Sequence, residues 1–190
     1  MNVLVIGAGP VGLSAALALC DKNIACRVVE KRDAPSKLSR AVGIMPQTIV
    51  ALAGLGVGNA IQAEGMAIQR MTIKRGHNTL MSLDLTKGNL GREHMIGLPQ
   101  NRTEEILRDA LRRQGVDPDY GVVVTDVATT QDQATVTFAD GAQQTFDWVI
   151  AADGVGSTAR QALGIAYPGT DLPGEWSIAD VDLSGPYRRG

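Results

Sequence analysis

The chain has 190 residues, of which 44% are hydrophobic and 20% are charged. This length allows one domain with its own core and the beginning of a second. Eighteen basic residues stand against 20 acidic ones. There is no positive excess to attract nucleic acid or an anionic membrane, and we expect neither as a partner.

The apolar run from Val11 to Cys20 is only about half the length of a membrane span. No basic segment precedes it, as a signal peptide would require. We therefore expect a soluble, cytoplasmic protein.

The first thirty residues have the pattern of a strand, a helix and a second strand. Val3-Leu4-Val5-Ile6 is an apolar run of the kind found in buried parallel strands. Residues 11–19 carry apolar side chains at helical spacing, and Asn23 is expected to end the helix because Asn tolerates a left-handed backbone. Cys26 to Val29 predict a second strand, and a right-handed crossover places it parallel to the first with Glu30 at its carboxyl end.

The middle of the chain mixes loops with short elements. Residues 31–43 are polar and predict a loop, while Gln47 to Leu55 has helical spacing. Met71 to Lys74 and Leu80 to Leu85 alternate apolar and polar residues, which predicts strands of a subsidiary antiparallel sheet.

A third helix is predicted just after residue 100. Asn101 and Glu104 have the spacing of a capping box, and apolar residues line one face of the following segment as far as Gly115. The sequence therefore predicts that Asn101 caps this helix.

The last part of the chain reads as strands followed by a short helix. Val122 to Val124, Ala134 to Phe138 and Gln143 to Phe146 predict strands, the last two joined by a turn at Asp140-Gly141. Trp148 to Ala152 is a further apolar strand that returns to the core. It ends in Asp153-Gly154, and Ser157 is placed to cap a short helix closed by Gly164.

Gly7-Ala8-Gly9-Pro10-Val11-Gly12 matches the G-x-G-x-x-G pattern between a predicted strand and a predicted helix. In such a unit Gly7 permits the turn, Gly9 lets the backbone approach a pyrophosphate, and Gly12 lets helix and strand touch. Glu30 lies eighteen residues beyond Gly12, where a carboxylate accepts hydrogen bonds from ribose hydroxyls. The structural alternative is a tight turn with an exposed glutamate.

Glu30 also bears on the choice of nucleotide. A carboxylate there repels the 2′-phosphate of NADP, although Lys31 and Arg32 beside it weaken this repulsion. FAD or NAD therefore fits the predicted site better.

Three later segments resemble the class A flavoprotein monooxygenases, the family of para-hydroxybenzoate, phenol and polyketide hydroxylases. Ser39-Arg40-Ala41-Val42-Gly43-Ile44-Met45-Pro46 is similar to the segment whose arginine lies near the FAD pyrophosphate. Leu98-Pro99-Gln100 is similar to the segment whose glutamine contacts the ribityl chain. The segment from Asp147 to Arg160 resembles the family's Asp-Gly motif, which helps to hold FAD.

Each segment also has a structural alternative: Arg40 as a solvated loop cation, Gln100 as a polar residue before a helix, and Asp153-Gly154 as a turn. With the βαβ unit, the resemblance gives the expected cofactor-binding residues, with Val127 included among them. They are Gly7, Ala8, Gly9, Pro10, Val11, Gly12, Glu30, Lys31, Arg32, Arg40, Gln100, Val127, Asp153 and Gly154.

The resemblance implies an FAD-dependent monooxygenase that hydroxylates an aromatic substrate with O2, using NADH or NADPH as a transient electron donor. The flavin carries the chemistry, so no catalytic side chain is named. Two other classes stay open: an NAD-dependent dehydrogenase, and a non-catalytic nucleotide-binding or assembly module.

The expected fold is α/β and Rossmann-like, with a parallel central sheet and a subsidiary antiparallel sheet. Residues 1–175 are expected to form the FAD-binding domain, and residues 176–190 the start of a truncated substrate-binding sheet. The family's second FAD motif does not occur in the chain. We therefore expect a missing C-terminal half, or a partner chain, to complete the site.

No metal site is predicted. His77 and His94 have no partner at metal-ligand spacing. Cys20 and Cys26 lack the Cys-x-x-Cys spacing and are expected to be free thiols in the core.

Overall fold

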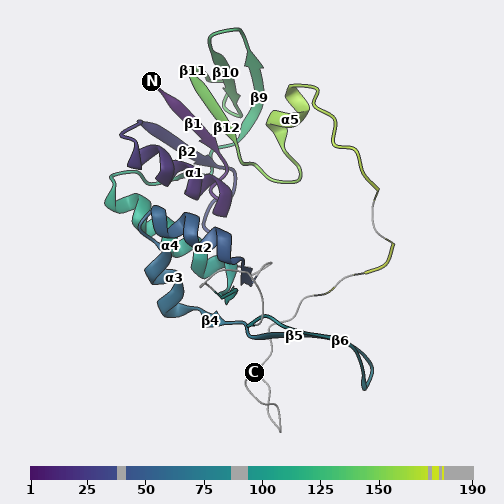
Figure 1. The fold of residues 1–190 in the computed structure, drawn as a ribbon. Helices are drawn as coiled ribbons and strands as arrows, with labels where there is room; N and C mark the ends of the chain where they lie inside the picture. Colours follow the sequence, from purple (N-terminus) through teal and green to yellow (C-terminus); the bar gives the residue numbers. More distant parts are fainter. Residues whose placement is uncertain (38–41, 87–93, 171–172, 176, 178–190) are drawn as a thin grey trace.

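A four-stranded parallel sheet forms the centre of the molecule (Figure 1). The structure is a computed structural model, and it describes residues 1–37, 42–86, 94–170, 173–175 and 177. The strand order is β12-β1-β2-β8, and all neighbouring pairs are parallel. The strands are β1 (Val3–Ile6), β2 (Cys26–Glu30), β8 (Asp119–Tyr120) and β12 (Trp148–Ala151).

The predicted βαβ unit is confirmed. Helix α1 (Pro10–Asp21) connects β1 to β2, and it buries Gly12, Leu13, Ala16 and Leu17. Asn23 has φ 56°, so the left-handed conformation expected at the end of this helix is present. Cys20 and Cys26 are free thiols but only half-buried, and burial together with the neighbouring Cys20 raises the pKa of Cys26 to about 11.

The two faces of the parallel sheet pack against different layers because successive strand residues point to opposite sides. Val5 and Val28 belong to a core shared with the helices, which includes Leu13, Ile49, Ile61, Leu107 and Leu111. Leu4, Ile6 and Val29 belong to a second core, which includes Val124, Val136, Phe138 and Phe146. The sheet is therefore buried on both faces, as its continuous apolar strands predict.

Three further helices share a core with α1: α2 (Pro46–Gly54), α3 (Gly58–Glu64) and α4 (Gln100–Arg113), of which α4 packs against α1. The predicted α2 and α4 are confirmed, whereas α3 was not predicted. The predicted capping box is wrong. The helix begins at Gln100 after Pro99, so Asn101 already lies inside its first turn and cannot cap it.

The three strands predicted from residues 122–146 form an antiparallel sheet of their own, with the order β11-β10-β9. Its strands are β9 (Val124–Thr129), β10 (Ala134–Phe138) and β11 (Gln143–Phe146). The first was expected at residues 122–124 but begins only at Val124, because the Val122 amide hydrogen-bonds to the Glu30 carbonyl beside β2. Helix α5 (Thr158–Ala162) is capped by Ser157 as predicted, its hydroxyl accepting from the Arg160 amide.

The remaining strands are short or exposed. Two-residue strands form a small sheet: β3 (Gly43–Ile44), β4 (Met66–Ala67) and β7 (Ile96–Gly97). The predicted pair β5 (Arg70–Arg75) and β6 (Asn78–Asp84) forms a hairpin that projects from the rest of the chain (Figure 1). The strand expected from Trp176 onward lies outside the described residues. None of the helices that the structure describes has the length and apolarity needed to span a membrane.

Candidate functional site

Three parallel strands end at one cleft, which we call the polar cleft. Strand β1 leads into Gly7, β2 ends at Glu30, and β12 leads into Asp153, and all three residues line the cleft. Its volume is about 510 Å³. Strand β1 lies between β2 and β12, so the cleft opens at the carboxyl ends of the strands where the chain order changes direction. Open α/β sheets bind their ligands at this point.

The glycines of the first turn have a backbone geometry that is compatible with the roles predicted for them. Gly7 has φ 103°, and a Cβ at this position would overlap the Ala152 carbonyl oxygen. A Cβ at Gly12 would overlap the Gly7 carbonyl oxygen, so α1 packs on the turn itself. Around a Cβ built at Gly9 no atom of the described residues lies within 4 Å, and Gly9 lines the polar cleft. The backbone at Gly9 is therefore open to a ligand.

The start of α1 faces this cleft. Gly9 precedes the helix with an extended backbone and no side-chain cap, and Pro10 occupies the first turn. The first amides of a helix have no partner within it, and together with the helix dipole they attract an anion. The arrangement suits a phosphate or diphosphate group.

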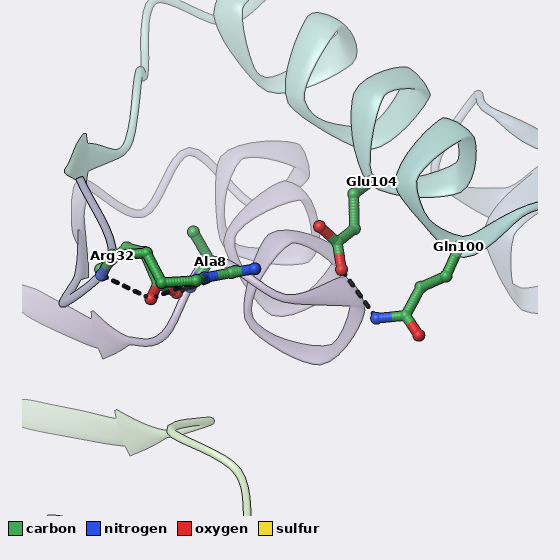
Figure 2. Close-up of polar contacts among 5 residues, drawn as sticks. Ala8, Arg32, Gln100 and Glu104 are labelled. Atoms are coloured by element: carbon green, nitrogen blue, oxygen red, sulfur yellow. Dashed lines mark hydrogen bonds and ion pairs between the residues drawn. The ribbon is translucent and has the colours of Figure 1, made fainter. Parts of the chain in front are cut away.

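Glu30 is held inside the same corner, with 6% of its surface exposed. Its Oε2 accepts from the Ala8 amide at 2.9 Å. Its Oε1 accepts from the Arg32 amide and from Arg32 Nε, both at 3.0 Å, and Arg32 Nη2 donates to Oε2 at 3.2 Å. Figure 2 shows the Arg32 and Ala8 groups that make these contacts. Burial opposes ionisation, but the bonds from Arg32 and Ala8 outweigh it and lower the pKa of Glu30.

The Glu30 carboxylate already accepts four hydrogen bonds, about as many as its lone pairs allow. A ribose hydroxyl can therefore bond to it only if a present donor moves. The Arg32 side chain is 37% exposed, and it can leave more readily than a backbone amide. The predicted ribose contact stays a prediction that involves displacement of Arg32.

The Asp153-Gly154 turn forms the wall opposite Glu30. Asp153 Oδ1 accepts from the Ser157 hydroxyl at 2.6 Å, and Oδ2 accepts from the Ala159 amide at 3.2 Å. These bonds tie the end of β12 to the start of α5. Asp153 and Gly154 both line the polar cleft, so the turn holds its own shape while it forms the wall.

A second cleft, which we call the apolar cleft, adjoins the first. It has a volume of about 470 Å³ and lies between α1, β3, α2 and α4. Its lining includes Pro10, Val11, Ile44, Met45, Thr48, Leu52, Leu98, Gln100 and Leu107. Among the described residues, Gln100 alone lines both clefts.

Gln100 is bonded to a buried carboxylate. Its Nε2 donates to Glu104 Oε1 at 2.8 Å, one helical turn along α4 (Figure 2). Glu104 lines the polar cleft, and only 2% of its surface is exposed. The capping-box pattern predicted a different position for Glu104, at the helix end, and gave no indication of its bond to Gln100 in the cleft. The four-residue spacing from Gln100 is the signal that could have found it.

The other predicted site residues lie in different places in the structure. Lys31 and Arg32 line the polar cleft, whereas Pro10 and Val11 line the apolar cleft. Arg40 lies outside the described residues. Val127 lies in the core between the two sheets, 3% exposed and paired with Val136. It is not among the described residues that line either cleft.

No group of three or more His, Cys, Asp or Glu residues in the described part of the chain is arranged to hold a metal ion.

The fold and the polar cleft define a dinucleotide-binding α/β domain. Residues 1–188 match the model of the FAD binding domain family, and the chain belongs to this family. Its relatives are FAD-dependent monooxygenases of aromatic and polyketide compounds.

Three relatives illustrate the similarity. The 6-methylpretetramide 4-monooxygenase of Streptomyces rimosus is 35% identical over 99% of this chain and 34% of its own length. The structure of OxyS anhydrotetracycline hydroxylase from Streptomyces rimosus has a TM-score of 0.77 at 30% identity, covering 90% of this chain and 36% of that one. A variant of Klebsiella pneumoniae HpxO complexed with FAD has a TM-score of 0.69 at 30% identity, covering 83% and 41%. The chain thus spans only about a third to two fifths of these relatives.

Proposed function

We propose that this chain is the FAD-binding part of a monooxygenase that hydroxylates an aromatic substrate, phenol-like or polyketide. The observation that carries the proposal is the polar cleft, where a glycine turn, a helix start and a buried glutamate meet at three strand ends. Membership of the FAD binding domain family favours FAD over NAD as the occupant.

The residues present fit the cofactor. The open backbone at Gly9 and the first amides of α1 would hold the diphosphate. Glu30 would accept a hydrogen bond from the ribose of the adenosine half, and the ribose hydroxyl would replace the Arg32 side chain as the donor. Gln100 stands where the polar cleft gives way to the apolar cleft, and it would contact the ribityl chain that leads to the flavin ring.

When bound, the flavin supplies the oxygen-transfer chemistry, with NADH or NADPH as electron donor and O2 as co-substrate. The residues of this chain bind and orient. The Asp153-Gly154 turn, fixed by Ser157 and Ala159, keeps one wall in place. The apolar side chains around Met45 and Leu98 exclude water from the neighbouring cleft.

We further propose that the whole enzyme is cytoplasmic and that residues 1–175 form its FAD-binding domain. The aromatic pocket would be formed mainly by the part of the relatives that this chain does not match. We therefore expect the 190-residue chain by itself to bind FAD mainly through its adenosine half, with weaker contacts beyond the diphosphate, and to hydroxylate poorly.

Equilibrium titration of the full chain with FAD, ADP and NAD tests the proposal. We expect FAD and ADP to bind and to compete with each other, because both place a diphosphate at α1. Binding of NAD with rejection of FAD would favour a dehydrogenase instead. A chain that binds none of the three would contradict any nucleotide-binding function and favour an assembly module.

A further inference from the structure

Glu104 is a buried carboxylate whose place in the fold is not explained by helix capping. It lies in the first part of α4, 2% exposed, and it lines the cleft proposed for an anionic diphosphate. Burying a carboxylate is costly unless hydrogen bonds and charges compensate. The Arg32 guanidinium, whose pKa is raised mainly by its hydrogen bond to Glu30 and also by the charge of Glu104, supplies part of that compensation.

The bond from Gln100 Nε2 to Glu104 Oε1, 2.8 Å long, fixes the orientation of the Gln100 carboxamide. The Gln100 amide nitrogen is the donor of this bond and the carboxylate oxygen is its acceptor, so the nitrogen end of the amide faces Glu104. The Gln100 carbonyl oxygen is then turned away from Glu104, as Figure 2 shows. Glu104 thereby favours the orientation in which a ligand at the junction of the clefts would meet the carbonyl end of the amide.

We propose that Glu104 is a positioning residue, which turns Gln100 so that its carbonyl oxygen accepts a hydrogen bond from a hydroxyl of the cofactor. The inference rests on the proposed function, and the hydroxyl is one that lies between the diphosphate and the flavin ring. ADP contains no such hydroxyl beyond its diphosphate. Glu104 therefore matters for FAD and not for ADP.

The decisive variant is Glu104→Gln, which keeps the size of the side chain. A glutamine at this position can both donate and accept, so it no longer selects one orientation of Gln100. One poorly oriented hydrogen bond changes an affinity by about 3- to 10-fold. We expect that loss for FAD, with the affinity for ADP unchanged.

Two further variants separate positioning from a general structural effect. In a Gln100→Ala background, Glu104→Gln should weaken FAD binding no further, because the residue acts only through Gln100. The exchanged pair, Gln100→Glu with Glu104→Gln, should restore most of the affinity, since the amide at 104 then holds a carboxylate oxygen toward the hydroxyl. A purely structural role predicts no such rescue.

Glu105→Gln is the matched control. Glu105 is the next residue on α4, and it pairs with Arg102 outside the cleft. We expect wild-type affinities for FAD and ADP from this variant. Urea denaturation of every variant shows which of them are folded.

Dissociation constants for FAD and ADP give outcomes that can be told apart. Equal weakening of both ligands by Glu104→Gln, or an undiminished effect of it in the Gln100→Ala background, would overturn the inference. So would a failure of the exchanged pair to recover. Absence of FAD and ADP binding in the wild-type chain would instead overturn the proposed function, and the inference with it.

Discussion

The polar and apolar clefts meet at Gln100, yet they are built differently. The polar cleft surrounds a backbone turn where glycines leave no side chain and three strands end, with Glu30, Arg32 and Glu104 among the side chains around it. The apolar cleft is lined by side chains from α1, β3, α2 and α4. A backbone site allows little variation, whereas a side-chain site can change its shape residue by residue.

The largest expected effect comes from Gly12→Ala. A Cβ at Gly12 would overlap the Gly7 carbonyl oxygen, so α1 must shift away from the turn. Overpacking of this kind costs about 1–3 kcal/mol of stability. We expect a lower free energy of unfolding in urea, together with loss of both FAD and ADP binding.

Gly9→Ala is the matched comparison. Its Cβ would lie in open space and the backbone is extended, so the free energy of unfolding should change little. The added methyl group enters the cleft, and ADP affinity should fall by about tenfold or more. If Gly9→Ala bound ADP like the wild type, the diphosphate would not lie on this turn.

The backbone site is also the part that the sequence predicts best. The apolar run of β1, the helical spacing of α1 and the position of Glu30 depend on neighbours along the chain, and all three are found where expected. The bonds between Glu30 and Arg32 could not be predicted, because they depend on the rotamer that Arg32 adopts.

The side-chain site depends on contacts between distant segments, and the sequence predicts it poorly. The strands β3, β4 and β7 have only two residues each and carry no periodicity of their own. Helix α3 is a short segment that follows α2 closely and has no capping signal. The predicted start of α4 was wrong because the spacing of Asn101 and Glu104 matches a capping box. The helix instead begins at Gln100, directly after Pro99.

A change confined to the apolar cleft should lower the affinity for FAD without changing the affinity for ADP. Thr48 lines this cleft from α2 and is exposed, so Thr48→Phe can fold normally while it fills the space. We expect FAD affinity to fall by about 3- to 10-fold with ADP affinity unchanged, because only FAD extends beyond the diphosphate. Competition titrations of the two ligands measure the difference.

Val50→Phe on the same helix provides the control for Thr48→Phe. Val50 is 60% exposed and is not among the described residues that line the apolar cleft. Its affinity for FAD should match that of the wild type. Equal losses of FAD and ADP affinity in Thr48→Phe would mean that the two clefts do not bind separate halves of one ligand.

The smallest effect concerns charge. Among the described residues, those that line the polar cleft include charged side chains such as Glu30, whereas those that line the apolar cleft include none. Burial raises the pKa of Glu30, but the bonds from Arg32 and Ala8 lower it further, to below its ordinary value of 4.5. Because the folded-state pKa lies below the unfolded one, ionised Glu30 stabilises the fold above about pH 4.5, and this contribution is lost as the pH falls through the folded pKa.

The free energy of unfolding of the wild type should therefore exceed that of Glu30→Gln most at neutral pH, and the two should converge in acid. Urea denaturation of both proteins between about pH 3 and pH 7 measures this, and Thr48→Phe should show no such convergence with the wild type. A difference in the free energy of unfolding that stays constant with pH would show that Glu30 stabilises the fold through the packing of its side chain and not through its charge.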